Sequence, residues 1–582
     1  MDKKIESPII GRVCKHATYS VSRTDKSNDL LVCKITNIHE NGERSTSFIG
    51  LENQPFDFWI VKKKYRNFND KRDYIKASMC DRHRSTYARM ASNINKILKG
   101  YPDNSLSLKQ AKSSQFVFGC EQTAPVKMKH RFFVKYPKFQ ETEPYDVAAY
   151  DVETDMHKKD NPVIMASTTF KKKVIFSAVR SWFDEDSDEE ILKKLKEAEE
   201  IYLKESLMER DAVVEYVLVD TPGQVVKTNV DKWHEWGPDW LISWNSEYDM
   251  TKNQEALAND GYDLSEVYCD PTVPWQYRYY KFDPGRTHKI KDNGDSSPLE
   301  PQERFPTVRS MAKWQWFDGM SFYAIKRAPQ GKKDSYTLQD TAVREKVKGK
   351  LYTDDTGIEV KPGTPDWHRI MQKNYKYLYC MYNIEDNFVI ERLNEKTHDY
   401  SLSFPMLIKS SEFFNYPSQP KCISDELSFI ALENGKVWGT CGLEQGDKFD
   451  KYKQDLRDWI ALLETEKNSD KGIAIFNGMP TVRSRGRRLV DDLDVTGAYP
   501  YGTFTENVSN YTTRIEVCKI QGLDRFGFRQ VSINYASSPK ANCIMLCNKL
   551  HGFPKLSEID DYWDKIVAKE NSNKEEKEVT MA

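Results

Sequence analysis

Short apolar segments followed by acidic residues recur in the middle of the chain. Residues 147–150 are apolar and precede Asp151 and Glu153, which predicts a buried strand whose alternation places both acids on one face. Residues 163–169 and 174–179 flank a lysine turn and predict a hairpin that extends the sheet. Residues 238–244 predict another strand, so a sheet is expected in this region.

Helical spacing of apolar positions predicts two longer helices. Residues 375–393 form one, in which Tyr382 and Asp386 are four residues apart and share a face. The acidic stretch 184–210 predicts an amphipathic surface helix. Its apolar positions are Ile191, Leu192, Leu195, Ala198, Ile201 and Tyr202. Residues 283–307 read as a long loop, and residues 314–323 as a strand and turn that carry Asp318.

These patterns predict an α/β fold class, α+β over the whole chain. A chain of 582 residues is too long for one core, so several domains are expected. We expect a mixed N-terminal domain at residues 1–140, an α/β domain at 141–400 and a further domain at 401–582.

Composition and charge bear on the location of the protein, the state of its cysteines and the kind of nucleic-acid site it could have. A mean hydropathy of -0.72 and the lack of a long apolar run argue against a membrane span. The first residues lack the apolar core of a signal peptide, which favours a cytoplasmic location. The 11 cysteines include no C-x-x-C pair and are expected to be reduced. The net charge of -1 predicts that any nucleic-acid site is a local groove.

Two runs in the first 140 residues interleave basic and aromatic residues. They are residues 62–72 and 127–138. Such mixtures can neutralise phosphates and stack on bases. The alternative for each run is a solvated strand edge protected by lysines.

Carboxylates at four places form an ordered set along the chain. Asp151 and Glu153 lie on the first strand, Asp249 follows a second strand, and Asp386 lies on the late helix one turn after Tyr382. Four acids can hold two Mg²⁺ or Mn²⁺ ions, and such sites suit phosphodiester hydrolysis. The alternative is that each acid is an incidental strand end or helix face.

The same positions form three motifs in order. They are D-x-E at Asp151 and Glu153, N-x-x-Y-D from Asn245 through Tyr248 to Asp249, and Y-x-x-x-D at Tyr382 and Asp386. The set resembles the exonuclease motifs in the proofreading domain of family B DNA polymerases. The resemblance implies an RNase H-like domain at 141–400 that removes nucleotides 3′ to 5′ from single-stranded DNA, with Asn245 and Tyr248 contacting the DNA.

Residues 489–500 resemble the first palm motif of the same family, usually D-x-x-S-L-Y-P-S. The match implies that Asp494 binds metal and that Tyr499 lies under the incoming sugar and excludes a 2′-hydroxyl. Gly497, Ala498 and Tyr501 depart from the motif, which puts its triphosphate contacts in doubt. The alternative is an acidic strand end followed by a turn.

Two further polymerase motifs are not found after Asp494, where 582 minus 494 leaves 88 residues. They are the fingers helix K-x-x-x-N-x-x-Y-G and the D-T-D hairpin; residues 352–357 resemble the hairpin only superficially. The resemblance therefore implies the N-terminal subunit of a split polymerase, most similar to the T-even-type phage enzymes, with a partial palm at 401–582. It implies a hetero-oligomer in which a second polypeptide supplies the fingers, the rest of the palm and the thumb, and in which deoxynucleoside triphosphates bind only with that partner.

Two other functions stay open. One is a free-standing 3′–5′ exonuclease whose palm remnant clamps DNA. The other is a catalytically dead DNA-binding protein on a polymerase scaffold, and the intact acids at all four exonuclease positions weigh against it.

Overall fold

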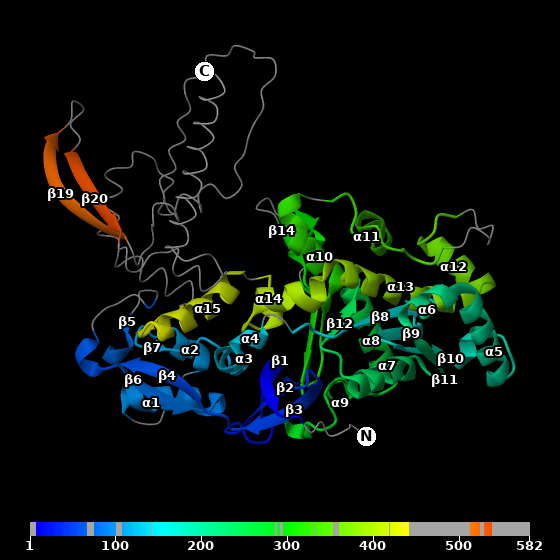
Figure 1. Cartoon of the computed structure of the whole chain (residues 1–582), viewed down its shortest axis with the longest axis horizontal. Helices are drawn as coiled ribbons and strands as arrows, with labels where there is room; N and C mark the ends of the chain where they lie inside the picture. The colour runs from blue at the N-terminus through cyan, green and yellow to red at the C-terminus, as the bar shows by residue number, and fades with distance from the viewer. Residues whose placement is uncertain are drawn as a thin grey trace, which may run out of the picture. The chain divides into compact units, whose positions relative to one another are not determined.

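A computed structural model describes most of the first 440 residues and two later strands (Figure 1). The described residues are 7–66, 71, 75–100, 107–140, 143–285, 288–290, 295–331, 333–352, 360–417 and 419–440, with the backbone of 513–523 and 529–537. The chain divides into two compact units, residues 1–66 with 76–425 and residues 67–75 with 426–582. The protein is a mixed α/β protein, as the sequence predicts. The domain boundaries predicted at residues 140 and 400 both fall inside the first unit and stay predictions.

A mixed sheet of eight strands forms the centre of the first unit, in the order β11-β10-β9-β8-β12-β17-β16-β13. Its strands are β8 (Val147–Thr154), β9 (Val163–Phe170), β10 (Lys173–Val179), β11 (Val213–Val219), β12 (Trp240–Ser243), β13 (Tyr280–Asp283), β16 (Thr307–Ser310) and β17 (Gln315–Asp318). β8, β12 and β17 run parallel, so their carboxyl ends meet at one edge, whereas β9 is antiparallel to both β8 and β10. The predicted strands and the predicted hairpin are confirmed.

The side chains of β8 alternate between two helical layers. Ala148, Tyr150 and Val152 pack in a core with residues of α7 (Pro222–Trp236) and α8 (Ser246–Asn259). Ala149 faces the opposite core, which includes residues of α10 (Gly319–Arg327) and α13 (Lys376–Thr397). Figure 1 shows α13 and α7 on opposite sides of the sheet. Asp151 and Glu153 continue the Ala149 series, so the fold directs both acids towards α13.

Smaller sheets and further helices complete the described part of the first unit. The first sheet has the order β1-β2-β3, and another has the order β6-β4-β7. These strands are β1 (Ile9–Val21), β2 (Asp29–His39), β3 (Arg44–Glu52), β4 (Phe56–Val61), β6 (Cys80–Ser85) and β7 (Val117–Phe118), and a short hairpin joins β14 (His288–Ile290) to β15 (Ser296–Pro298). The other helices are α1 (Tyr87–Lys99), α2 (Leu108–Lys112), α3 (Ala124–Lys135), α4 (Pro137–Gln140), α5 (Asp188–Ala198), α6 (Lys204–Arg210), α9 (Leu264–Tyr268), α11 (Leu338–Glu345), α12 (Pro365–Asn374) and α14 (Phe404–Ile408).

The remaining elements lie wholly or partly outside the first unit. They are β5 (Ile75–Lys76), α15 (Gln419–Glu433), β18 (Lys436–Val437) and an antiparallel pair of longer strands, β19 (Thr513–Leu523) and β20 (Arg529–Ser537).

The amphipathic helix predicted within residues 184–210 is present, but the predicted burial of Ile201 is wrong. Ile191, Leu195 and Ala198 of α5 are buried, as expected. A π-helical turn at Glu199–Leu203 follows and adds a residue to the turn, which shifts the helical phase. As a result Leu203 is fully buried, whereas Ile201 is 68% exposed.

The basic run at residues 127–138 is not a solvated strand edge. Most of it belongs to α3, where Lys127 and Lys129 are only 8% and 5% exposed. Lys127 donates to the carbonyl of Asp57 at 2.7 Å and Lys129 to the carbonyl of Ser411 at 3.4 Å. These two lysines cross-link the fold, and the run does not present one continuous basic surface. The run at 62–72 lies partly outside the described residues.

Within the described residues no helix is long and apolar enough to cross a membrane. The cysteines of this part of the chain are all buried and free of disulfides. They are Cys14, Cys33, Cys80, Cys120, Cys269, Cys380 and Cys422.

Candidate metal centre

β8 and α13 bring three of the predicted carboxylates together. Asp151 and Glu153 leave β8 on the face that α13 covers, and Asp386 lies near the middle of α13. One ligand oxygen from each of these residues lies within 4.8 Å of the other two. A divalent cation could therefore contact all three, and we call these residues the carboxylate trio.

Hard oxygen ligands are what Mg²⁺ and Mn²⁺ prefer, so the trio fits the expected metals. Asp386 is 4% exposed, and its Oδ1 atom is buried with no hydrogen-bond partner in the described structure. A buried carboxylate oxygen without a partner is costly, and a cation would relieve that cost.

Asp249 lies in the first turn of α8 and is not a member of the trio. The side chain is 4% exposed, and its Oδ2 atom also lacks a hydrogen-bond partner among the described residues. Burial raises its pKa well above the usual value, and the nearby charges of Asp318 and Glu153 raise it further. The structure thus places Asp249 in the electrostatic field of the trio, beside the cluster rather than in it.

The trio itself resists full ionisation. Burial raises the pKa of Asp151 well above the usual value, and the charges of Glu153, Asp249 and Asp386 add to this shift. Burial also raises the pKa of Glu153 to about 7. Like charges in a buried site disfavour each other, so bound protons compete with a cation for these oxygens.

Lys350 is a site residue that the sequence patterns did not reveal. Its ammonium donates to Asp386 Oδ2 at 2.5 Å and to Tyr382 OH at 2.6 Å. Burial lowers the pKa of Lys350, but the charge of Asp386 and other nearby negative groups outweigh this effect and leave the pKa above its usual value. The lysine is therefore charged and balances part of the trio's negative charge.

Lys350 reaches the trio from a loop that follows α11. Its backbone N–H donates to Gln339 Oε1 at 2.8 Å, and neighbouring Lys348 donates to Glu205 of α6 at 2.7 Å. No periodic pattern marks this loop, and the only signal was its place next to residues 352–357, the superficial hairpin match. Residues 353–359 lie outside the described part.

One face of α13 supplies the polar contacts to the acids. Tyr382 and Asp386 share this face, as predicted, and so do Tyr379 and Asn383, which complete a helical spacing of three and four residues. Asn383 Nδ2 donates to Asp151 Oδ2 at 2.8 Å, and the Tyr379 hydroxyl donates to Glu153 Oε2. Sequence reasoning missed Tyr379 and Asn383, although the same periodicity could have found them.

The hydroxyl that contacts the D-x-E pair is that of Tyr379, and the hydroxyl of Tyr382 accepts a hydrogen bond from Lys350. The two rings are stacked with centroids 5.8 Å apart. Tyr379 OH also lies 2.8 Å from His368 Nδ1 and 3.3 Å from Gln372 Nε2, both on α12. Because the hydroxyl has one hydrogen and gives it to Glu153, these two nitrogens must donate to its oxygen.

The predicted DNA contacts lie at the start of α8. Asn245 is exposed and its side chain does not cap the helix. Tyr248 is 40% exposed, and its hydroxyl lies 2.7 Å from Thr154 Oγ1 at the end of β8. The tyrosine ring is thus held next to the strand that carries Asp151 and Glu153.

Asp318 fixes the helix that carries Tyr248 and Asp249. Its Oδ2 accepts the N–H of Ser246 at 2.7 Å, and its Oδ1 accepts the N–H of Ser321 at 2.6 Å. A single buried carboxylate therefore caps α8 and α10 together. The strand predicted within 314–323 is confirmed as β17, whereas the predicted turn is wrong, because α10 begins at Gly319. The capping role of Asp318 is new.

The palm residues Asp494 and Tyr499 lie outside the described residues, and their roles stay predictions. Comparison with known proteins adds no identification: no protein-family model matches the chain, and a search of curated proteins finds no match.

Proposed function

We propose that the chain is a metal-dependent 3′–5′ exonuclease, acting as the proofreading part of a family B DNA polymerase. The convergence of Asp151, Glu153 and Asp386 within 4.8 Å, with Lys350 on the last of them, carries the proposal. The motif match specifies these acids independently of their positions in space. The RNase H-like architecture is likewise proposed, supported by a mixed sheet whose central strand β8 carries two of the acids.

In the proposed hydrolysis, different residues have different roles. Divalent ions on the carboxylate trio would lower the pKa of the attacking water and stabilise the leaving oxygen. Tyr379 and Asn383 hold Glu153 and Asp151 in place through the hydrogen bonds described above. Lys350 and Tyr382 lie beside Asp386, where their polar hydrogens can orient a water molecule. The exposed ring of Tyr248 can stack on a base of the 3′ end.

The polymerase part of the proposal rests on the sequence match at Asp494 and Tyr499. Nucleotide transfer by two metal ions needs a second palm carboxylate. We therefore propose that DNA synthesis requires residues beyond these 582, which a partner polypeptide would supply in a hetero-oligomer. The free-standing exonuclease and the inactive DNA-binding scaffold remain as alternatives.

Degradation of a 3′-labelled single-stranded DNA tests the proposal. The purified chain with Mg²⁺ should release nucleotides from the 3′ end, and Asp151→Ala/Glu153→Ala should reduce the rate by at least about 10³-fold, since metal catalysis contributes several kcal/mol. Asp186→Ala/Glu189→Ala, which removes two exposed acids near the start of α5, is the matched charge control and should stay active. A folded wild-type chain that binds DNA without cleaving it would favour the inactive scaffold. Cleavage without primer extension would leave the polymerase part to be sought with a partner.

A further inference from the structure

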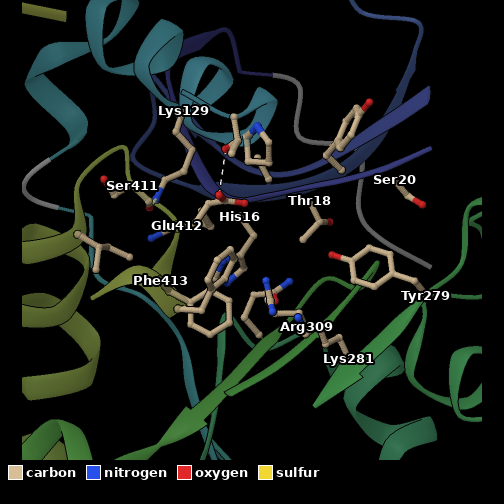
Figure 2. Close-up of a pocket in the computed structure, with 18 of the residues that line it drawn as sticks. His16, Thr18, Ser20, Lys129, Tyr279, Lys281, Arg309, Ser411, Glu412 and Phe413 are labelled. Atoms are coloured by element: carbon tan, nitrogen blue, oxygen red, sulfur yellow. Dashed lines mark hydrogen bonds between the residues drawn. The ribbon is translucent and has the colours of Figure 1, made fainter. Parts of the chain in front are cut away.

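A cavity of about 400 Å³ lies at the amino ends of β12 and β17, and Figure 2 shows residues that line it. Trp240 and Gln315 line it, and they are the paired first residues of the parallel strands β12 and β17. The acids lie towards the carboxyl ends of the parallel strands. Each strand spans about 10 Å at about 3.3 Å per residue, so the cavity and the trio are separate sites.

Two sheet edges enclose this cavity. Residues 15–21 of β1, an edge strand of the first sheet, form one wall. Tyr279 and Lys281 form another at β13, the edge strand of the eight-stranded sheet, and the segment 411–414 closes a third side. All these residues belong to the first compact unit.

Two cations on the wall, Arg309 and Lys281, form no ion pair with a described residue; the nearest acid to act on Arg309 is Glu412. Arg309 is half-buried, its Nε atom has no hydrogen-bond partner, and its guanidinium lies 4.1 Å from the centre of the Phe414 ring. Lys281 is exposed at the mouth and forms no ion pair with a described residue. Elsewhere in the unit, the similarly buried Arg327 is paired with Asp399 at 2.7 Å.

An unpaired and partly desolvated guanidinium favours an anion, and its planar fork matches a phosphate. The one acid on the wall is Glu412, which accepts a hydrogen bond from Thr123 at 3.0 Å. Burial raises the pKa of Glu412, which weakens its repulsion of an anion.

The rest of the wall favours a planar aromatic group. Phe413, Phe414 and Tyr279 contribute rings, and Figure 2 shows the Tyr279 hydroxyl directed into the cavity. Thr18 and Ser20 add hydroxyls from β1 that can donate to or accept from the edge of a base. Phosphate and aromatic ring occur together in a nucleotide.

We propose that this cavity binds one nucleotide, either free or as part of a single strand. Arg309 and Lys281 hold the phosphate, and Tyr279 and Phe414 contact the base. The site is independent of the proposed nuclease activity.

Binding measured in EDTA separates the two sites, because it needs neither metal nor cleavage. Equilibrium dialysis with labelled dTMP follows the free nucleotide, and fluorescence anisotropy with labelled oligo(dT) follows the strand. The Arg309→Gln/Lys281→Gln variant should weaken binding of at least one probe about tenfold or more, the loss expected for about 1.4 kcal/mol of phosphate contact. Phe414→Leu should weaken the same probe, and ribose 5-phosphate, which lacks a base, should compete poorly.

Lys171→Gln/Lys193→Gln removes two charges from exposed positions elsewhere and is the matched control. The cavity variants leave the carboxylates of the trio intact, so failure of the nuclease proposal would not affect their comparison with the control. Loss of dTMP binding identifies a free nucleotide as the ligand, and loss of oligo(dT) binding alone identifies a strand. Equal weakening by the control, or no weakening by any cavity variant, would overturn the proposal. Lys281→Gln alone, a change at an exposed side chain, keeps the test decisive if the double variant does not fold.

Discussion

Lys350 and Asp386 form the closest charge contact of the candidate metal centre. They are 36 positions apart in the sequence, and both are largely buried, with side-chain exposures of 17% and 5%. Removing one member of a buried ion pair leaves the other uncompensated, which costs more than the pair contributes in net stability. Lys350 therefore stabilises the carboxylate trio as well as serving the proposed chemistry.

Replacing Lys350 with Met should lower the free energy of unfolding in EDTA by about 3 kcal/mol, because the buried Asp386 loses its partner. In an Asp386→Asn background the same replacement should cost much less, since no charge is stranded. Urea unfolding of the four proteins measures the coupling. Equal costs in the two backgrounds would show that Lys350 does not act through Asp386.

The raised pKa of Glu153, about 7, predicts a pH dependence of stability in EDTA. A carboxyl whose pKa is higher in the folded than in the unfolded chain binds extra protons when folded, so its contribution is full below its unfolded pKa. That contribution is lost as the pH rises through about 7. Thermal unfolding should therefore show stability falling between pH 5 and 8, and Glu153→Gln should flatten the fall.

Metal should reverse this trend, because cations bind the deprotonated acids. Added Mg²⁺ should raise the thermal midpoint more at pH 8 than at pH 6 in the wild type, and much less in Asp151→Ala/Glu153→Ala. A Mg²⁺ effect that does not depend on pH would contradict a site formed by these carboxylates.

Helix α8 depends on the strand-end residue Asp318 for its position. Asp318 accepts N–H groups from the first turns of α8 and α10, so both helices begin at one buried carboxylate. Asp249 and Tyr248 lie within three residues of the capped Ser246. Their placement relative to the trio is therefore a property of the β17–α10 turn.

Asp318→Ala should lower stability by about 1–2 kcal/mol for each lost cap and should also slow cleavage about tenfold or more, because α8 can shift. Asp318→Asn keeps one carbonyl acceptor and should recover part of the rate. Asp263→Ala is the matched control: Asp263 caps α9 through the N–H of Ser265 at 2.7 Å. It should cost similar stability without changing the nuclease rate. Equal rate losses in the two variants would mean that Asp318 has only a structural role.

The first unit is held together between its sheets by a buried ion pair. Lys34 of β2 lies 2.5 Å from Asp239, just before β12, with side-chain exposures of 3% and 5%. Lys34 also donates to the carbonyls of Gly237 and Pro238, and His16 Nε2 lies 2.6 Å from the carbonyl of Asp239. This junction joins the first sheet to the eight-stranded sheet.

Lys34→Met should therefore cost about 3–5 kcal/mol, the usual result of stranding a buried charge. Both sheets should lose this stability in a single unfolding transition. Hydrogen exchange should then show reduced protection of the β2 and β12 amides together. The exposed pair Lys172 and Asp211, 2.6 Å apart, provides the control, and Lys172→Met should cost far less stability than Lys34→Met because water screens the pair. Loss of protection in β2 alone would show that the first sheet unfolds separately.

Local patterns in the sequence were sufficient to predict the strands β8 and β12, the hairpin β9–β10, the helix α13 and the order of the acids. Alternation and helical periodicity are set by residues close in the sequence, so these predictions do not depend on how distant segments pack. They failed at Ile201, where a π-helical turn changes the phase, and at Lys127 and Lys129, whose burial depends on packing against distant segments.

The set of residues in the candidate metal centre depends on contacts between segments far apart in the chain. Tyr379 and Glu153 are separated by 226 positions, and Lys350 reaches Asp386 from a loop with no pattern of its own. The sequence placed Asp249 with the other acids by motif, whereas packing of α8 against the sheet leaves it beside the trio. Spacing along the chain can predict which residues share a strand or a helix face. The distances between those faces depend on how the elements pack, and these distances select the trio, its lysine and its tyrosine.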